Sequence, residues 1–464
     1  SAAVPSPMTR ATSPMAASSA SPLETELKFQ VPPAHSAALR RAVATASARS
    51  VRLQAMYADT VDQRLAAAGL ALRLRKEGRL WVQTLKGRGD GLMRRLEHEV
   101  RLPPQRGEPM LDPQLHAGSA AGEMLAQVLA DGAELHTLYR TDIRRLQRRV
   151  RHGGALIEIA YDHGRIVAGS HVVAVNEIEF ELVSGPAAAL PALAARWVAR
   201  YGLWWDVRTK SERGFRLALG RDHVPAVKAL AAELAADAGP GAAWATVLHA
   251  ALVQALPNAA EIAAGTDAPE HLHQLRVALR RLRSALRWFA AWSGDAAAAQ
   301  MLELEWREPF RRLGAARDTD VLTHSLQPAL AAAGAPPFTW PAAAAAAGAG
   351  PGEVVRSAEF TALLLRTLAL SMRPAAADAG SDRPALEAAA ADVLHRAWRR
   401  VRRDATGFAE ASVDEQHRTR KRLKRFRYGL EFLLPLLARK PARRLHATVC
   451  RALDALGELN DLHT

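Results

Sequence analysis

Two carboxylates and an amine alternate with apolar residues near the start of the chain, in the segment Glu24-Thr25-Glu26-Leu27-Lys28. Alternate side chains of a β-strand project from one face, so Glu24, Glu26 and Lys28 are expected to lie on the same side. Such a concentration of charge is strongly unfavourable unless the face lines a wet cavity that holds counter-ions. The segment therefore predicts a site for a metal ion and an anion.

Paired carboxylates suit a hard divalent cation such as Mg²⁺, which shares its coordination shell with water and phosphate oxygens. Arginine and lysine side chains on neighbouring strands can bind the remaining phosphate oxygens. Phosphoryl transfer requires positioning, charge neutralisation and an oriented nucleophile, with little covalent help from the protein. Because the sequence has neither a P-loop motif nor a nucleophile elbow, these residues indicate metal-assisted phosphoryl chemistry.

Short segments with a period of two recur from residue 23 to about residue 215, which predicts β-strands. Their charged residues repeatedly occupy one parity, as in Arg73 with Arg75 and in the run 177–182. For any single strand, a solvated outer face is the favoured explanation. Because several strands show the pattern, some rich in acids and others in bases, we expect a barrel with a charged lumen.

From about residue 222 onward, apolar residues recur with the period of amphipathic helices. This half contains an internal repeat, in which two basic rows at helical spacing are each followed by a Leu-Gly segment. The first row comprises His273, Arg276, Arg280, Arg283 and Arg287, and the second comprises His417, Arg420, Lys424 and Arg427. The Leu-Gly segments, residues 313–318 and 456–461, are expected to be matching turns. The sequence therefore predicts a duplication of helical units.

A solvated helix surface is the alternative explanation for each basic row. Two observations favour a binding surface instead. The rows contain almost no intervening acids, so the usual pairing of opposite charges along a helix is missing, and both rows start with the same His-x-x-Arg pattern. Two converging rows would form a basic groove for an extended polyanion, and protonation of His273 and His417 below about pH 6.5 would strengthen it.

Composition favours two domains and an anionic ligand. The chain has 464 residues, more than one hydrophobic core usually supports. Its formal charge of +15 and its pI of about 10.7 favour polyanionic partners. A single cysteine, Cys450, excludes an internal disulfide framework. Outside Ala/Gly-rich stretches no long apolar run is free of charge, so no membrane span is expected.

The expected boundaries follow from shifts in composition. Residues 1–22, rich in Ser, Ala and Pro, are expected to be a disordered leader. A strand-rich domain is expected over 23–218, a linker over 219–240 and a helical domain over 241–464. Within the helical domain, the Ala-rich stretch 331–352 is expected to be a loop or linker, because Gly and Pro interrupt it.

Residues 23 to about 218 resemble the CYTH superfamily, the triphosphate tunnel metalloenzymes. The resemblance rests on an ordered set of motifs: Glu24-x-Glu26-x-Lys28, Leu72-Arg73-Leu74-Arg75, Thr84-Leu85-Lys86-Gly87, Glu177-x-Glu179-x-Glu181 and Lys210-Ser211-Glu212-Arg213-Gly214. It implies an eight-stranded antiparallel β tunnel with flanking helices, which binds a triphosphate together with Mg²⁺ or Mn²⁺. The whole chain is therefore expected to be an α+β protein of two domains.

The CYTH resemblance also implies roles for individual residues. The implied phosphate ligands are Lys28, Arg73, Arg75, Lys86, an arginine from the Arg140 or Arg144 segment, Lys210 and Arg213. The implied metal ligands are Glu24, Glu26, Glu177, Glu179 and Glu181. Catalytic roles are implied for Glu24, Glu26, Lys28, Glu179 and Glu181, of which the four glutamates would orient the attacking water. Glu97, Glu99, Glu158 and Asp162 are further candidates, and the strand register decides which of them face inward.

The second half resembles the CHAD domain, a His-rich helical module that binds inorganic polyphosphate. Its two half-repeats match His273-x-x-Arg276-Val277-x-x-Arg280-Arg281-x-Arg283 and His417-x-x-Arg420-Lys421-x-x-Lys424-Arg425-x-Arg427. The resemblance implies an all-α domain of duplicated helical bundles. That family's domain usually continues beyond the second Leu-Gly segment, so a shortened last bundle is expected here.

Together these features predict a metal-dependent enzyme that hydrolyses inorganic triphosphate to pyrophosphate and phosphate, with a helical domain that binds polyphosphate. Two alternatives stay open: a triphosphatase for an organic substrate such as thiamine triphosphate, and a non-catalytic polyphosphate-binding scaffold. A related adenylate cyclase is a less favoured variant. No specific nucleic acid is expected, because aromatic residues do not accompany the basic rows in a pattern for base stacking. The resemblance implies the cytoplasm, at polyphosphate granules, while the oligomeric state is left open.

Overall fold

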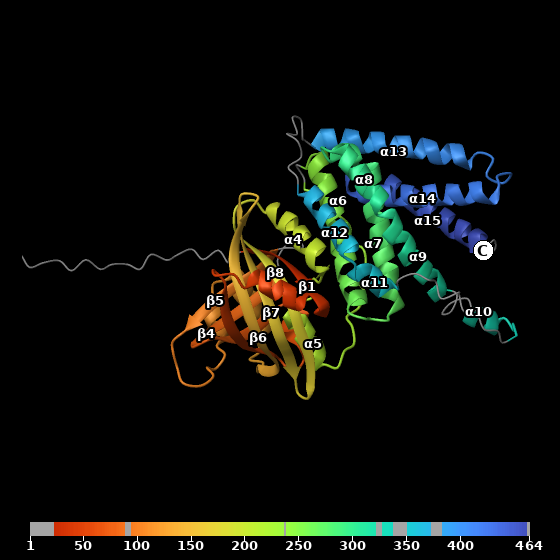
Figure 1. Ribbon diagram of the computed structural model, residues 1–464. Helices are drawn as coiled ribbons and strands as arrows, with labels where there is room; N and C mark the ends of the chain where they lie inside the picture. The colour runs from red at the N-terminus through yellow and green to blue at the C-terminus, as the bar shows by residue number, and fades with distance from the viewer. Residues whose placement is uncertain are drawn as a thin grey trace, which may run out of the picture.

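A computed structural model describes residues 23–88, 94–235, 238–321, 327–336, 350–372 and 383–461. The expected leader and most of the Ala-rich stretch lie outside these residues. Figure 1 shows two halves, a curved β-sheet with helices around it and a body made only of helices. We call residues 23–218 the sheet half and residues 240–461 the helical half. The predicted α+β architecture of two parts is confirmed.

The sheet is antiparallel and has nine strands. They are β1 Leu23–Gln30, β2 Arg49–Asp59, β3 Ala71–Glu77, β4 Leu80–Arg88, β5 Arg94–Leu102, β6 His136–His152, β7 Ala155–Ala168, β8 His171–Ser184 and β9 Trp204–Trp205. Their order is β5-β4-β3-β2-β6-β7-β8-β1-β9. In β1, Leu27 and Phe29 are buried in the hydrophobic core, as the alternation with Glu26 and Lys28 requires.

The expectation of a closed eight-stranded tunnel needs correction. The short strand β9 pairs with Phe29 and Gln30 at the end of β1 and brings the count to nine. The first three residues of β1 pair with β5, whereas its remaining five pair with β8. The curved sheet therefore meets itself along only three residue pairs, because β1 changes partners halfway along its length.

Helices flank the sheet. They are α1 Ser36–Val43, α2 Arg64–Ala67, α3 Ala120–Val128, α4 Ala189–Tyr201 and α5 Lys210–Ala218, with short 3₁₀ turns at Pro33–His35 and Pro113–His116. The start of α5 is fixed by a capping box, in which Thr209 and Glu212 satisfy each other's backbone N–H groups. This cap places Lys210, the first residue of α5, at the sheet.

The helical half contains α6 Pro240–Ala263, α7 Pro269–Trp288, α8 Ala296–Glu305, α9 Arg307–Val321, α10 Gln327–Ala332, α11 Pro351–Arg356, α12 Ala358–Ser371, α13 Arg383–Ala405, α14 Val413–Leu433 and α15 Arg439–Asp461. Short 3₁₀ turns cover Ala290–Trp292 and Leu434–Leu436. The two basic rows lie on α7 and α14, which pack against each other. In the described part of the chain, no helix has both the length and the apolar character that a membrane crossing needs.

The two Leu-Gly segments are helical, so the prediction that they form turns is wrong. Residues 313–318 lie inside α9, and residues 456–461 form the end of α15. Each glycine faces an arginine of the adjacent basic row. A β-carbon at Gly314 would lie 3.3 Å from Arg276 Nη2, and one at Gly457 would lie 3.5 Å from Arg420 Nη2. The two copies of the repeat therefore share a close packing of helices. Neither glycine marks a change of chain direction.

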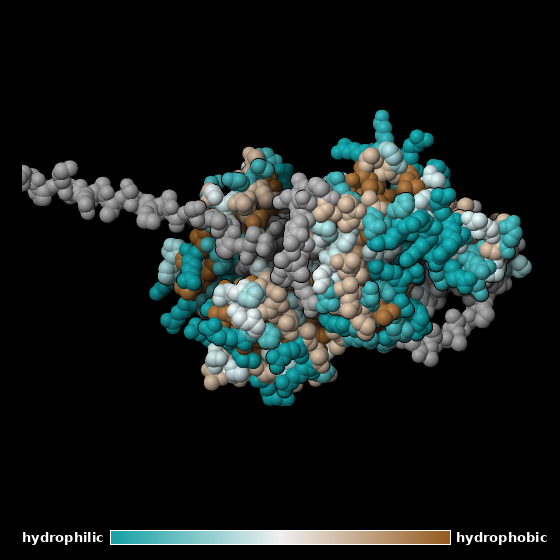
Figure 2. Space-filling view, turned by 90° about the horizontal axis from the view of Figure 1, so that it is seen from above, coloured by the Kyte–Doolittle hydropathy of each residue, from teal (hydrophilic) through white to brown (hydrophobic). Residues whose placement is uncertain are grey.

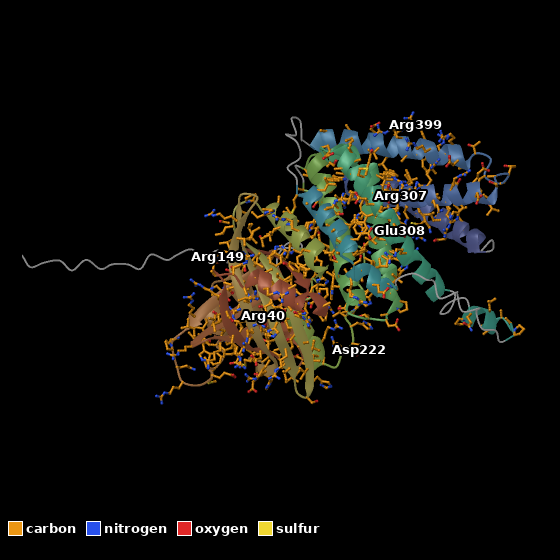
Figure 3. All side chains as sticks on the ribbon, viewed as in Figure 1. Arg40, Arg149, Asp222, Arg307, Glu308 and Arg399 are labelled. Carbon is orange, nitrogen blue, oxygen red and sulfur yellow. The ribbon has the colours of Figure 1, made fainter. Side chains whose placement is uncertain are left out.

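The two halves pack directly on each other. Helix α4 of the sheet half lies against α12 of the helical half, and their buried leucines belong to one continuous hydrophobic cluster. The segment that joins α5 to α6 includes Asp222, which lies between the halves (Figure 3). Figure 2 shows that hydrophilic residues cover much of the upper face of the helical half, and the apolar surface is broken into small areas.

Candidate functional site

The inner face of the curved sheet encloses a cavity of about 550 Å³. The candidate residues that line it are Glu26, Lys28, Arg73, Arg75, Lys86, Glu97, Glu99, Glu158, Asp162, Glu179, Glu181 and Lys210. They come from β1, β3, β4, β5, β7, β8 and the start of α5. Charged side chains of β3, β4 and β5, on one arm of the sheet, thus face those of β1, β7 and β8, on the other arm. We call the space between the two arms the cavity.

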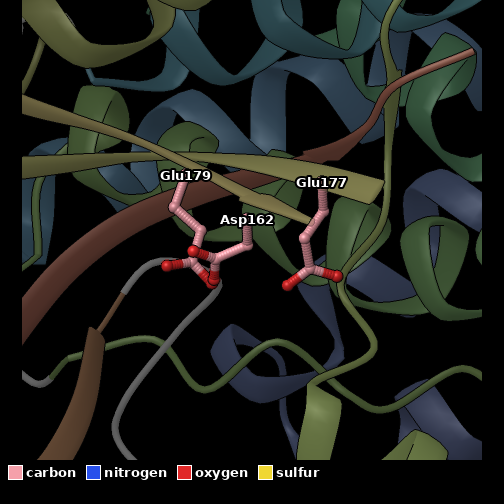
Figure 4. Close-up of side chains that lie close together, drawn as sticks. All are labelled: Asp162, Glu177 and Glu179. Carbon is pink, nitrogen blue, oxygen red and sulfur yellow. The ribbon is translucent and has the colours of Figure 1, made fainter. Parts of the chain in front are cut away.

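Three acidic side chains gather on β7 and β8. One oxygen atom from each of Asp162, Glu177 and Glu179 lies within 4.8 Å of the others. Figure 4 shows the three carboxylates projecting to the same side of their strands. Asp162 and Glu177 are almost fully buried. Buried carboxylates require cationic partners, and here the protein supplies them.

Lys210 and Arg145 neutralise this acidic cluster. Lys210 Nζ lies 2.7 Å from Asp162 Oδ2 and 2.8 Å from Glu179 Oε1, and it also contacts Glu177. Arg145 donates hydrogen bonds to Asp162 at 2.7 Å and to Glu179 at 2.5 Å. Burial disfavours the charge on Lys210, but the three carboxylates outweigh it and hold the pKa of Lys210 well above its usual value.

A second group of acids lies beside the first on the cavity wall. Glu181 is paired in the sheet with Glu26 on one side and with Glu158 on the other. Burial, followed by the charges of Glu158, Glu26 and Glu179, raises the pKa of Glu181 to about 7. The protein's own cations therefore do not fully balance this group.

The donor chemistry of the second group fits a hard divalent cation. Carboxylate oxygens on adjacent strands are the ligands that Mg²⁺ and Mn²⁺ prefer. A cation there would relieve the repulsion that raises the pKa of Glu181. Lys210 and Arg145 bind Asp162 and Glu179 directly. In the second group Glu158 pairs with the exposed Arg149 at 3.2 Å, and the pKa of Glu181 is still raised. Glu26, Glu158 and Glu181 therefore form the better candidate for the metal.

Basic side chains occupy the opposite arm of the sheet. Arg73 and Arg75 on β3 and Lys86 on β4 face the cavity beside Glu97 and Glu99. Lys86 Nζ lies 2.5 Å from Glu97 Oε2, and Arg75 Nη2 lies 3.2 Å from Glu99 Oε1. Within the described chain, the buried Nε atoms of Arg73 and Arg75 lack a hydrogen-bond acceptor. These donors are suited to the oxygens of a phosphate group.

The structure places neither Arg140 nor Arg144 in the cavity. Arg140 makes a bidentate pair with Glu108, at 2.7 and 2.9 Å, outside the cavity. Arg144 is exposed on the opposite parity of β6. The cavity instead receives Arg145, the neighbour of Arg144. Basic residues on β6 occupy positions that point inward as well as positions that point outward. The sequence alone therefore could not show which arginine faces the cavity.

Two predicted site residues are left, Arg213 and Glu24. Arg213 lies at the edge of the cavity, and the side chain of Glu24 is outside the described part of the chain. Arg213 on α5 lies 3.0 Å from Glu177 Oε2 and donates to the Ala174 carbonyl, so it closes the acidic side. The side chain of Glu24 falls outside the described residues, although its backbone pairs with Arg95. Tyr57 lines the cavity and had not been expected there. Burial favours its neutral phenol, but Arg73, Lys210 and Lys86 outweigh burial and lower the pKa of Tyr57.

A second candidate site lies where α7 meets α14. We call the residues Arg276, Arg280, Arg283, Arg420, Lys424 and Arg427 the basic face. Arg276, Arg280 and Arg283 surround the Phe310 ring, with guanidinium carbons 5.6, 5.7 and 5.1 Å from its centroid. Arg280 Nη1 lies 3.4 Å from the Tyr428 hydroxyl on α14. The two rows are therefore adjacent in space, as the repeat predicted.

The pKa of Lys424 reflects how close the two basic rows lie to each other. Burial, followed by the charges of Arg280, Arg420, Arg427 and Arg276, lowers the pKa of Lys424 to about 8. Two of these arginines come from α7 and two from α14. Lys421 is exposed on α14, one turn before Lys424. Such a concentration of positive charge favours a bound polyanion.

Comparisons with known proteins match both halves of the chain. The CYTH domain model matches residues 22–212, and the CHAD domain model matches residues 246–464. The inorganic triphosphatase of Haemophilus influenzae is 27% identical over 164 residues. That match covers 35% of this chain and 44% of the relative, so the chain matches less than half the length of that protein.

Two solved structures are among those that match parts of the chain. The CHAD domain from the plant Ricinus communis is 28% identical, with a TM-score of 0.40, and the match covers 52% of this chain and 81% of that one. A Hippeastrum protein described as having a dominant triphosphatase activity is 21% identical, with a TM-score of 0.32. That match covers 43% of this chain and 96% of that one.

Proposed function

Because the chain carries a CYTH domain followed by a CHAD domain, we propose that it hydrolyses inorganic triphosphate to pyrophosphate and phosphate in the cavity, with a divalent cation. The observation that carries this proposal is that one cavity is lined both by carboxylates of β1, β7 and β8, which we call the acidic wall, and by Arg73, Arg75 and Lys86 of β3 and β4. A triphosphate with a divalent cation has the complementary distribution of charge. Pure anion binding would gain nothing from the acidic wall, which argues against a non-catalytic scaffold.

Each wall has its own part in the proposed reaction. Glu26, Glu158 and Glu181 would hold Mg²⁺ or Mn²⁺, which supplies neutralising charge to the phosphate oxygens. Arg73, Arg75 and Lys86 bind the phosphate oxygens on the opposite wall. A carboxylate of the acidic wall orients a water molecule toward the terminal phosphorus and takes its proton. The new P–O bond forms as the bridging P–O bond breaks, and pyrophosphate leaves.

Lys28 and Lys210 hold the cavity in shape before substrate enters. Lys28 is nearly buried and donates to the carbonyl of Arg208, in the segment that leads into α5. Lys210 is bound to the acidic cluster. Both ammonium groups face the cavity, so each can also bind a phosphate oxygen after substrate enters.

The test is phosphate and pyrophosphate release from inorganic triphosphate with Mg²⁺ or Mn²⁺. We expect Glu26→Ala and Lys28→Ala to lower kcat/KM by about 10²-fold or more, because each removes a charge that faces the reacting phosphates. Arg144→Ala is the matched control, since Arg144 is exposed outside the cavity. Unchanged release by the cavity variants would contradict the proposal.

Substrate identity is tested in the same assay. Thiamine triphosphate shares the terminal phosphates of inorganic triphosphate, so it is the relevant competitor. A higher kcat/KM for the organic substrate would replace inorganic triphosphate as the proposed substrate. Formation of pyrophosphate and cyclic AMP from ATP would indicate a cyclase instead.

We further propose that the basic face binds inorganic polyphosphate, which is supported by the convergence of two basic rows around Lys424. Cations from both rows can contact successive phosphates of an extended chain. Binding should weaken as salt increases, because screening reduces attraction between exposed charges. Competition between polyphosphate and DNA at equal phosphate concentration tests the specificity, and stronger binding of DNA would contradict the proposal.

A further inference from the structure

A buried carboxylate joins the two halves. Glu261, near the end of α6, is 1% exposed. Its Oε1 atom lies 2.7 Å from Arg216 Nη1 of α5 and 3.9 Å from Arg208 Nη1. Its Oε2 atom accepts a hydrogen bond of 3.0 Å from Thr266. Glu261 therefore belongs to the helical half, but its two arginine partners belong to the sheet half.

These arginines frame the segment that closes the cavity. Arg208 precedes α5, and its backbone carbonyl accepts a hydrogen bond from Lys28 in the cavity. Its guanidinium is fixed by Asp206, with distances of 2.9 and 2.8 Å. Arg216 lies near the other end of α5. Both ends of the segment that carries Lys210 are thus linked to one carboxylate.

The inner side of the same segment faces the acidic wall. Lys210 binds Asp162, Glu177 and Glu179, and Arg213 binds Glu177. The segment is therefore held between carboxylates of the cavity on one side and Glu261 on the other. A small displacement of α5 would move the Lys210 ammonium relative to the acids and to any bound phosphate.

We propose that Glu261 is a positioning residue for triphosphate hydrolysis: it holds α5 from the helical half so that Lys210 faces the cavity correctly and Arg213 stays paired with Glu177. This inference rests on the proposed hydrolase function. It gives the helical half a part in catalysis that is separate from polyphosphate binding. Misplacement of a reacting or binding group by about 1 Å can lower a rate by about 10²-fold.

The test uses the full chain with the substitution Glu261→Gln, which keeps the size of the side chain but removes its charge. We expect kcat for triphosphate to fall by about tenfold or more, with a smaller change in KM, because geometry in the transition state is more demanding than ground-state binding. Polyphosphate affinity should stay unchanged, since Glu261 lies outside the basic face.

Glu303→Gln is the matched control. Glu303 is a buried carboxylate of the helical half, and its ion-pair partners in the described chain are Arg283, Arg287 and Arg307 of the same half. Glu303→Gln should lower the melting temperature by about as much as Glu261→Gln does, and it should leave kcat for triphosphate unchanged. An equal loss of kcat in both variants would show a general effect of stability and would overturn the inference.

A double-mutant comparison covers the case in which Glu261→Gln folds poorly. If Glu261 and Arg216 act as one unit, Arg216→Met should lower kcat similarly, the double variant should be no worse than either single variant, and Arg216→Lys should retain more activity. Additive losses would overturn the inference. A wild-type chain that releases no phosphate overturns the proposed function as well, whereas an active wild type with fully active Glu261→Gln overturns only the positioning role.

Discussion

Glu181 is the residue that should make the cavity most sensitive to pH. Burial and the neighbouring carboxylates raise its pKa from 4.5 to about 7. Because the folded pKa exceeds the unfolded one, the stabilising contribution of this carboxyl group is present below the unfolded value and is lost as the pH rises through about 7. Without divalent cations, the melting temperature should therefore fall between about pH 4.5 and about pH 7, the unfolded and folded pKa values of Glu181.

Two comparisons isolate this effect. In Glu181→Gln the position carries no titrating group, so the fall in melting temperature over the same pH interval should be smaller. With Mg²⁺ present, wild-type protein should also lose less stability, because the cation favours the charged carboxylate. Differential scanning fluorimetry in matched buffers measures both, and an identical pH profile for wild type and variant would contradict the assignment.

Lys424 predicts the pH dependence of the basic face. Its pKa is lowered to about 8, so the ammonium is charged below that value and neutral above it. Polyphosphate affinity should therefore decrease as the pH rises through about 8, and Lys424→Arg should flatten the profile because arginine stays charged. Fluorescence polarisation with labelled polyphosphate measures this, and an equally steep decrease in Lys424→Arg would exclude Lys424 as its cause.

At the level of single residues, the sequence predicted the side of a strand well where charged and apolar residues alternate strictly. The alternation in β1 and β8 correctly predicted that Glu26, Lys28 and Glu179 share one face. It failed on β6, where Arg144 and Arg145 are adjacent and both parities are basic. The inward position there depends on pairing register, which neighbouring strands determine and the segment itself does not.

At the level of elements, the contact between α7 and α14 depends on Gly429. A β-carbon at this position would lie 2.2 Å from the ring of Trp288 on α7. Gly429→Ala should therefore force the helices apart and lower the free energy of unfolding by about 1–3 kcal/mol. Polyphosphate affinity should fall as well, because the basic face spans the two helices that would separate.

Gly457→Ala on α15 is the control for that experiment. Its added β-carbon would lie 3.5 Å from Arg420 Nη2, an ordinary contact with the end of a flexible side chain. Alanine favours a helix over glycine by about 0.5–1 kcal/mol, so this variant should be as stable as wild type or more stable. Urea denaturation measures the free energy of unfolding of wild type, Gly429→Ala and Gly457→Ala. A Gly429→Ala protein as stable as Gly457→Ala would show that Trp288 can move without penalty.

Element types were predictable because their hydrophobic periods differ clearly between the two halves. The strands between residues 23 and 184 and the helices after residue 240 are where the periods of two and of about 3.6 place them. The Leu-Gly segments were misjudged as turns because glycine commonly interrupts helices. In this fold each glycine lies inside a helix and faces an arginine of a neighbouring helix. Local sequence does not reveal this tertiary arrangement.

At the level of the whole molecule, positive charge extends beyond the basic face. On α13, Arg399, Arg400, Arg402 and Arg403 are exposed, and Figure 3 shows Arg399 on the outer side of that helix. These charges add to the field that attracts polyanions over a range of about 10 Å at 0.1 M salt. Substitutions on this surface should therefore change the rate of polyphosphate association more than the dissociation rate.

The hydrophobic core argues that the two halves unfold together. One buried cluster runs from Phe29 and Phe180 in the sheet, through Leu193 of α4, to Leu364 of α12 and Phe432 of α14. Separation of the halves would expose these apolar surfaces and break the ion pair between Glu261 and Arg216. Thermal unfolding followed by tryptophan fluorescence and by circular dichroism should therefore show one coincident transition. A chain that ends after residue 218 should be less stable than the full chain and should bind a hydrophobic dye. Two resolved transitions, or a fully stable isolated sheet half, would show that the shared core contributes little to either half.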